Sequence, residues 1–401
     1  MLSVDEARAR ILAPLRPTAP EIVALPDAWG RVLAAPVTAR LTQPPADMSA
    51  MDGYAVRAAD CVVGARLPII GRAPAGRPFA GALTPAATVR LFTGSVIPNG
   101  ADTVVPQEDV EREGDAITVA VMPQSGRHIR RAGQDFKQGD TIVPAGVRLG
   151  ARAIGLIAAG NHPWAAVHRR PQIAILATGD EIVLPGEPLG AGGIVSSNAH
   201  ALAALVRAGG GVPVVFPIAA DDPGAIAAAA DRLSGIDLLV TTGGASVGEH
   251  DLVQSGLSER GFALDFWRIA MRPGKPLLFG RLGAVPVLGL PGNPVSAFVC
   301  AILFLLPALA RLGGLANATL PTIPARLGKP LRANDERADH LRASLTAEAD
   351  GTLVATAFDR QDSSLLQLLS AADGLILRAP HAPAAMAGMA VSVLRLDSFG
   401  L

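Results

Sequence analysis

Apolar residues in the middle of the chain form an alternation of strand-like and helix-like segments. Residues 172–178 and 236–242 are apolar runs without alternation, a pattern typical of strands buried on both faces. Helices are predicted at 198–208, with Ser196 and Ser197 as candidate N-caps, and at 223–233, with Asp222 before a proline. The alternation predicts a mostly parallel sheet with helices on both faces. Further strands are expected at residues 213–218, 263–270 and 286–290, and further helices at residues 251–259 and from Val295 onward.

The segments on either side of this region have a different pattern. Residues 4–12 and 149–160 carry helical signals, and the second segment ends at a glycine suited to a C-cap. Residues 46–139 contain Gly and Pro every few positions with short β-branched runs between them, which indicates a small all-β unit. Strand-like runs return from Pro321 and indicate a C-terminal barrel or sandwich. The sequence therefore predicts a multi-domain α/β plus β fold, and 401 residues suit two to four domains of roughly 100–200 residues each.

The charge balance, the hydropathy and the cysteine content of the chain argue against several classes of binding partner. The 35 basic and 35 acidic residues balance, so no overall field favours nucleic acid or an anionic membrane surface. The longest apolar run, residues 295–310, is shorter than the roughly 20 residues that cross a bilayer and is expected to be a buried helix. The N-terminus is charged and lacks an apolar signal core. Two cysteines in apolar surroundings, Cys61 and Cys300, suggest buried thiols in a reducing compartment, and we expect a cytoplasmic protein.

Three glycine-containing loops follow or precede strands of the predicted sheet, at residues 178–181, 241–251 and 290–296. Tight turns that expose backbone N–H groups bind anions, particularly at helix N-termini, and Ser246 and Ser296 add hydroxyl donors. Turn formation alone would explain one such loop. Three loops on one sheet favour a binding site at its carboxyl edge, where ligands of such sheets bind.

Charged residues accompany these loops. Arg268, Arg272 and Lys275 suit an oxyanion or a phosphate, although each alone could belong to an ordinary solvated face. Acidic residues next to phosphate-binding groups indicate a hard divalent cation, most simply Mg²⁺. The three acids that follow strands are Glu181, Asp221 and Asp251. For Asp221, a capping role beside Asp222 is an equally good explanation.

Nine sequence blocks resemble, in order, the motifs of the molybdopterin molybdenumtransferase family, which includes bacterial MoeA proteins and the E-domain of gephyrin-like proteins. The resemblance covers about residues 3–398 and rests on SAMDGYAV, TGSVIPNGADTVV, AGQDFKQGD, TGDEIV, SSN, TTGGASVGEHD, RPGKP, LPGNPVSA and QDSSLLQLLSAADG. It implies an L-shaped subunit in a homodimer that converts adenylylated molybdopterin and molybdate to molybdenum cofactor and AMP. The upstream adenylylating enzyme is a further candidate partner.

The resemblance also implies a division into four domains. An elongated linker and dimerisation domain would comprise residues 1–42 and 140–169, and a β-rich insert domain residues 43–139. The molybdopterin-binding α/β/α domain would comprise residues 170–315, and a C-terminal β-barrel-like domain residues 318–401.

Site residues are carried over motif by motif. The catalytic set is Asp52, Thr93, Asp135, Glu181, Asp221, Asp251 and Lys275, with Glu181, Asp221 and Asp251 also proposed for the metal. The substrate set is Ser196, Ser197, Asn198, Gly243, Gly244, Ser246, Gly248 and Arg268. The molybdate set is Arg272, Lys275, Pro276, Ser296, Arg342 and Ser363. Arg268 and Arg272 stand where many relatives carry Lys, and the planar guanidinium prefers bidentate anion contacts.

Other functions remain open at this stage. A nucleotide-dependent oxidoreductase would use the Thr241–Gly248 loop, but that loop lacks the G-x-G-x-x-G spacing. A non-catalytic scaffold is a second alternative, and the retained acids and cations argue against it. The upstream adenylylating enzyme shares the α/β fold but would not need the additional β domains.

Overall fold

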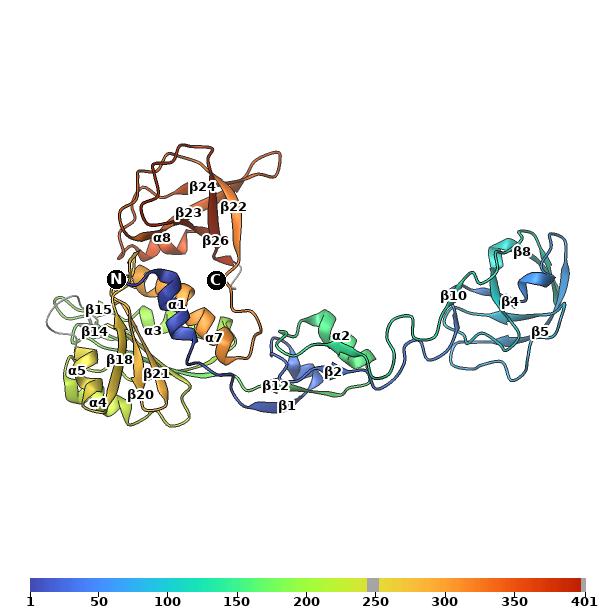
Figure 1. Cartoon of the computed structure of the whole chain (residues 1–401), viewed down its shortest axis with the longest axis horizontal. Coiled ribbons are helices and arrows are strands. Elements are labelled where there is room, and N and C mark those ends of the chain that lie inside the picture. The colour runs from blue at the N-terminus through green and yellow to red at the C-terminus, as the bar shows by residue number, and fades with distance from the viewer. Residues whose placement is uncertain (244–251, 398–401) are drawn as a thin grey trace.

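The chain folds into four units arranged along an extended shape (Figure 1). The computed structural model describes residues 1–243 and 252–397. An α/β unit and a small barrel lie together at one end, and a β-rich unit lies at the other. A thin unit with few strands connects them. This arrangement confirms the predicted multi-domain architecture.

The α/β unit is built on a six-stranded sheet with the order β16-β13-β17-β21-β20-β18. The strands β16, β13, β17 and β21 pair in parallel, and β18 runs in the same direction, because β20 is antiparallel to both of its neighbours. The sheet is therefore mostly parallel, as predicted, although the sequence pattern missed β20. Its strands are β13 (Gln172–Ala177), β16 (Val212–Val215), β17 (Leu238–Thr242), β18 (Phe262–Trp267), β20 (Leu278–Leu282) and β21 (Val285–Leu290).

Helices cover both faces of this sheet, because each face contributes to a separate apolar core. One core contains α3 (Asn198–Ala208) and the long helix after β21, and the other contains α4 (Pro223–Ala230) and α5 (Leu252–Ser258). Asp222 caps α4 through the backbone N–H of Ala225, as predicted. Ser197 occupies the N-cap position of α3, as predicted, but its side chain forms no capping hydrogen bond.

The long helix is the central element of the first core. It runs through α6 (Pro294–Cys300), a π-helical turn (Ala301–Leu305) and α7 (Leu306–Leu312). At 19 residues it is long and apolar enough to cross a membrane, but 83% of its most apolar window is buried inside the fold. The predicted buried helix is therefore confirmed, although it is longer than the sequence suggested. Burial raises the pKa of the Cys300 thiol on this helix, and Cys61 is buried in the β-rich unit.

The N-terminal helix α1 (Val4–Leu12) packs on the same core. Ala7 and Ile11 of this helix are fully buried there. A capping box between Ser3 and Glu6 begins the helix. Residues 4–12, which the sequence-based division places in the elongated domain, thus pack on the α/β unit.

The elongated unit is a pair of thin ribbons. β1 (Pro20–Ala24) pairs with β12 (Trp164–His168), and β2 (Val37–Thr38) pairs with β11 (Thr141–Val143). The helix α2 (Ala151–Ala159) covers their small apolar core and ends at Gly160, the predicted C-cap.

The β-rich unit contains a sheet with the order β7-β4-β6-β5-β9-β8. These strands are β4 (Gly53–Val56), β5 (Arg66–Ala73), β6 (Thr88–Leu91), β7 (Thr103–Pro106), β8 (Val110–Glu113) and β9 (Ala116–Val119). The short pair β3 (Met48–Ser49) and β10 (Ile129–Arg130) lies beside it.

The C-terminal unit is a closed barrel, because β23 pairs with both β24 and β25. The strands are β22 (Thr322–Leu327), β23 (Ala338–Ala347), β24 (Leu353–Ala357), β25 (Gly374–Arg378) and β26 (Ala390–Arg395), with the helix α8 (Leu366–Ser370) between β24 and β25. The short strand β19 (Met271–Arg272) leaves the α/β unit and pairs with β23. This pairing attaches the barrel to the segment that carries the predicted cations.

Candidate functional site

A cleft of about 760 Å³ lies at the carboxyl edge of the α/β sheet. Its volume falls within the range of small-molecule sites in proteins. Every loop that ends one of the four parallel strands contributes to its wall, and the barrel adds one residue. The predicted residues that line it are Glu181, Ser196, Ser197, Asn198, Asp221, Gly243 and Pro276. The additional ones are Ala177, Thr178, Ile182, Ile194, Val195, Thr242, Leu252, Pro291, Gly292, Asn293, Pro294 and Ser364.

Gly243 permits two of these loops to meet. Its φ of +91° lies in a region that other residues rarely adopt. A Cβ atom at this position would lie 2.3 Å from the backbone oxygen of Thr178. The glycine of this loop is thus required by close packing at the base of the cleft.

Asn198, in the first turn of α3, links the start of this helix to the ends of β17 and β21. Its side-chain amide donates to Thr242 Oγ1 at 2.8 Å and to the backbone oxygen of Gly292 at 2.7 Å. The Thr242 hydroxyl in turn donates to the backbone oxygen of Pro291 at 3.2 Å. Asn198 therefore holds the base of the cleft in place, and this amide is engaged with protein atoms.

Two acids, Glu181 and Asp221, line one side of the cleft, and Asp180 is their neighbour. The backbone N–H of Asp221 donates to Asp180 Oδ1 at 3.0 Å, and Glu181 follows directly in the chain. Burial first, and then the charges of Asp180 and Glu181, raise the pKa of Asp221 above its ordinary value. None of the three forms an ion pair within residues 1–243 and 252–397.

Two hydroxyl groups at the ends of neighbouring strands lack partners. Thr178 Oγ1 and Thr241 Oγ1 are buried and form no hydrogen bond within the described part of the chain. Thr178 also lines the cleft. A buried polar group without a partner is costly, and such groups are frequent where a ligand binds.

The predicted cations behave differently from one another. Lys275 is half-buried, directly precedes Pro276 of the cleft, and forms no ion pair with any residue that the structure describes. Arg272 donates two hydrogen bonds to Asp339, at 2.8 and 2.6 Å, and a longer one to Asp335. Arg268 lies with its guanidinium 3.7 Å from the ring centre of Trp267.

The barrel contributes the loop that carries Ser363 and Ser364. The Ser363 hydroxyl accepts from Asn293 Nδ2 at 3.0 Å, and its backbone oxygen accepts from the N–H of Val295. Arg342 is almost fully buried and donates to Gln361 and to the backbone oxygens of Asp362 and Leu365. Arg342 thus holds the loop in place through its backbone oxygens. Most of its donors and of those of Arg272 are engaged with protein atoms, and Ser296, at the start of α6, is buried.

Comparisons with known proteins cover almost the whole chain. Residues 2–160 match the MoeA N-terminal region (domain I and II), residues 174–311 a probable molybdopterin binding domain, and residues 324–396 the MoeA C-terminal region (domain IV). A Mycobacterium tuberculosis protein named molybdopterin molybdenumtransferase 2 is 35% identical over 388 residues, which are 94% of this chain and 95% of that protein. The chain belongs to the molybdopterin molybdenumtransferase family.

Two further relatives support this membership. A Nostoc protein named molybdopterin molybdenumtransferase is 38% identical over 81% of this chain and 77% of its own length. The crystal structure of a molybdopterin biosynthesis MoeA protein from Pyrococcus horikosii superposes with a TM-score of 0.84, at 28% identity, over 98% of this chain and 99% of that one. The predicted family, its transferase class and its fold are thus confirmed.

Three residues of the molybdopterin molybdenumtransferase pattern lie far from this cleft. Asp52 accepts hydrogen bonds from the N–H and the hydroxyl of Thr93, at 2.7 and 2.8 Å, and these bonds lower the pKa of the carboxyl group. Asp135 is exposed in the loop after β10. Asp52 directly precedes β4 and Thr93 follows β6 of the β-rich unit, and Asp135 lies between β10 and β11. The β-rich unit and the α/β unit lie at opposite ends of the molecule (Figure 1). One chain does not bring them to the cleft.

Some residues of the family pattern lie outside the described residues, namely Gly244, Ser246, Gly248 and Asp251. Conversely, the structure adds Asp180, Thr178, Asn293 and Ser364 to the cleft or its immediate support. Asp180 belongs to the motif TGDEIV and Asn293 to the motif LPGNPVSA. Their position next to predicted site residues was the one sequence feature that could have identified them. Only the fold distinguishes them from ordinary turn residues.

Proposed function

We propose that this chain transfers molybdenum from molybdate to adenylylated molybdopterin, with hydrolysis of the adenylate, and releases molybdenum cofactor and AMP. One observation carries the proposal: Glu181, Asp221 and glycine-containing turns line one sheet edge of a protein in this family, and Lys275 directly precedes Pro276 of the same cleft. None of these three side chains forms an ion pair within the described residues. An acidic and a basic group in one cleft suit a ligand with a polyanionic tail that also binds a cation.

The polyanionic part of the substrate would lie over the loops after β13, β17 and β21. Their backbone N–H groups and the hydroxyls of Thr178, Ser196 and Ser197 offer donors to phosphate oxygens. Asn198 positions these loops through Thr242 and Gly292. Arg268 remains a proposed substrate contact.

Molybdate, a tetrahedral dianion, would bind between the α/β unit and the barrel. Lys275 supplies the charge, and Pro276, Ser296 and Ser363 complete the proposed pocket. Arg272 and Arg342 enter this proposal as residues that hold β19 and the barrel loop in position, because most of their donors are already engaged with protein atoms. Either would contact molybdate only after exchanging those partners.

Glu181 and Asp221 are the residues that would hold Mg²⁺, together with Asp251. Within the described residues, no three His, Cys, Asp or Glu side chains are grouped closely enough to form a cation site by themselves. Mg²⁺ in phosphate chemistry is commonly held by one or two carboxylates and by the phosphates of the substrate, so two acids fit it. The ion would offset negative charge on the phosphate oxygens as the phosphoanhydride is hydrolysed.

A homodimer would complete the site. The extended subunit keeps Asp52, Thr93 and Asp135 far from its own cleft, and a second copy could bring them to it. We also infer a cytoplasmic location. The upstream adenylylating enzyme is a candidate partner.

The proposal is tested by incubating the protein with adenylylated molybdopterin, Mg²⁺ and molybdate and measuring AMP. We expect AMP release that requires all three and that is lost in Asp251→Ala, whereas pterin binding by that variant persists. Full turnover by Asp251→Ala would remove this acid from the mechanism. Absence of AMP release by the wild-type protein, with the pterin bound, would favour a non-catalytic scaffold.

A further inference from the structure

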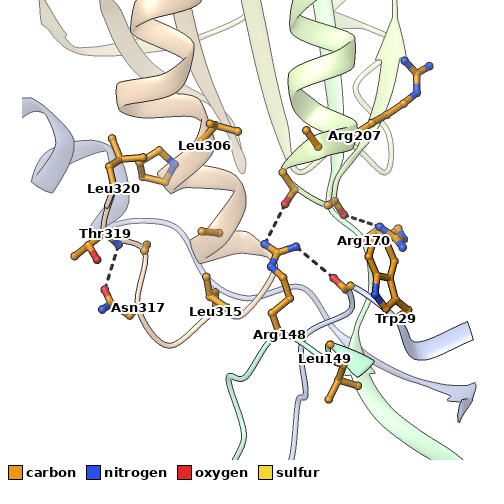
Figure 2. A pocket seen from close by; sticks show the side chains of 18 residues that line it. Trp29, Arg148, Leu149, Arg170, Arg207, Leu306, Leu315, Asn317, Thr319 and Leu320 are labelled. Atoms are coloured by element: carbon orange, nitrogen blue, oxygen red, sulfur yellow. Dashed lines mark hydrogen bonds between the residues drawn. The ribbon is translucent and has the colours of Figure 1, made fainter. Parts of the chain in front are cut away.

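A second cavity, of about 500 Å³, lies where the elongated unit meets the α/β unit (Figure 2). Trp29 and Arg148 reach it from the elongated unit, and Arg207 from the end of α3. Arg170, directly before β13, and Gly210, shortly before β16, place it at the amino edge of the sheet. It therefore lies on the opposite side of the sheet from the carboxyl-edge cleft, and the two share no lining residue.

The cavity has an excess of positive charge. Arg148, Arg170 and Arg207 line it, and no Asp or Glu is among its described lining residues. Arg148 keeps contact with solvent, yet the protein around it and then the charge of Arg170 lower its pKa. Burial and then the charge of Arg31 lower the pKa of Arg170, whereas the charge of Glu21, which pairs with Arg31 outside the cavity lining, acts in the opposite direction. Arginines gathered in a cavity whose described lining contains no carboxylate form a site for an anion.

The end of α3 explains only part of this arrangement. Arg148 donates to the backbone oxygens of Gly30 and Gly209 at 3.3 and 3.4 Å, and Arg170 to Gly210 at 3.4 Å (Figure 2). A helix C-terminus carries roughly half a negative charge, whereas two guanidinium groups carry two positive ones. These contacts are long, and they use two of the five N–H donors of Arg148. Positive charge and donors therefore remain for a ligand.

Most of the remaining side chains in the wall are apolar, with Asn317 and Thr319 as the polar ones. Leu306, Leu315 and Leu320 line one side, and the indole of Trp29, 70% exposed, stands at another. An exposed tryptophan next to arginines is suited to stacking on a flat ring. We propose that this cavity binds a phosphorylated aromatic small molecule, with the phosphate on Arg148 and Arg170 and the ring against Trp29 and the leucines.

Such a ligand would bridge two units of the chain. Arg148 belongs to the elongated unit and contacts Gly209 of the α/β unit. A ligand held by Arg148 and Arg170 together therefore stabilises one orientation of the elongated unit relative to the sheet. The site is independent of the proposed transferase reaction, so either proposal can fail alone.

Calorimetric titration of the full-length protein with 1-naphthyl phosphate tests the proposal. We expect one saturable site per chain and binding at least tenfold weaker for the neutral probe 1-naphthol. Arg148→Gln and Arg170→Gln should each weaken 1-naphthyl phosphate binding by roughly tenfold or more, because a charge-assisted contact is lost. The matched control is Arg152→Gln, which removes an exposed charge from α2 outside the cavity and should leave the affinity unchanged.

A second variant distinguishes loss of binding from loss of the fold. Thr319→Glu adds a negative charge at the rim and leaves the Arg148 contacts intact, so it should weaken binding while the melting temperature stays near that of the wild type. The proposal is overturned if no saturable binding occurs, or if Arg148→Gln and Thr319→Glu bind as the wild type does. It is also overturned if Lys275→Ala weakens binding in their place, since the probe would then occupy the carboxyl-edge cleft.

Discussion

The barrel and the α/β unit form the two walls of the carboxyl-edge cleft, and the charged side chains on or behind each wall differ in their partners. On the barrel side, Arg272 is paired with Asp339, and Arg342 is bonded to Gln361 and two backbone oxygens. On the α/β side, Asp221 lies among acids of the same charge, and Lys275 has no ion pair within the described residues. Both walls carry residues that the family pattern marks, so the pattern alone does not distinguish them.

This difference separates support from binding. A charged group whose donors are satisfied by the protein contributes to the position of its neighbours, and removing it destabilises the fold. A charged group left without a partner, or held beside like charges, reduces stability until a ligand compensates it. We therefore expect substitutions on the barrel side to act mainly on stability and those on the α/β side mainly on binding and turnover.

The largest effect is expected at Arg342. Arg342→Leu removes one of the two donors to the Gln361 side-chain oxygen and leaves the backbone oxygens of Asp362 and Leu365 without their guanidinium donor, and should destabilise the barrel by about 4 kcal/mol. Calorimetric unfolding of the full-length protein measures it, with Arg326→Leu on exposed β22 as the control expected to change little. An unfolding transition like that of the wild type would mean that Arg342 is available for molybdate.

The next largest effect concerns His340, which is buried beside β19 in the barrel. Burial lowers its pKa to about 4, well below its ordinary value of 6.5. As the pH falls from 6.5 to about 4, this histidine becomes protonated in the unfolded chain but stays neutral in the folded chain. The free energy of unfolding therefore falls by up to about 3 kcal/mol. His340→Gln should flatten this pH dependence of the melting temperature. His381→Asn, at an exposed histidine with positive φ, should leave it in place.

A smaller effect on binding is expected at Lys275. Lys275→Ala should weaken molybdate binding by about tenfold, near 1.4 kcal/mol, because the proposed pocket loses a cation that forms no ion pair within the described residues. Lys329→Ala, which removes a cation paired with Asp359 on the barrel surface, is the matched control and should bind molybdate normally. Isothermal titration calorimetry gives both affinities. Equal affinity in both variants would contradict the division between the two walls.

The smallest effect on stability, and of the opposite sign, is expected at Asp221. Its pKa is raised, so at neutral pH the ionised carboxyl group costs stability, and the cost disappears as the pH falls to the ordinary value of 3.8. Asp221→Asn should raise the melting temperature by about one degree at pH 7 while abolishing AMP release. Asp339→Asn, which breaks the pair with Arg272, should lower the melting temperature. A lower melting temperature for Asp221→Asn would show that its carboxylate supports the fold.

Local pattern was sufficient for most elements of the α/β unit. The helices at residues 4–12 and 198–208 match α1 and α3 because helical spacing, a capping serine or a following glycine mark their ends. The strand β20 was missed because Leu278–Leu282 follows the turn that carries Lys275, and its pairing with β21 depends on contacts, not on spacing. The small barrel was anticipated as a class, whereas its closure between β23 and β25 was visible only in the structure.

The sequence by itself determined which side chains reach the carboxyl edge of the sheet, because parallel strands place the loops that follow them at one edge. Glu181, Asp221 and Gly243 were identified in this way. Only the tertiary structure decided which charges remain available there. Asp339 lies 67 residues from Arg272, and the arginine cavity joins residues from Trp29 to Leu320, so neither arrangement leaves a local signal. Neutralisation of a charge depends on distance in space, which spacing along the chain does not encode.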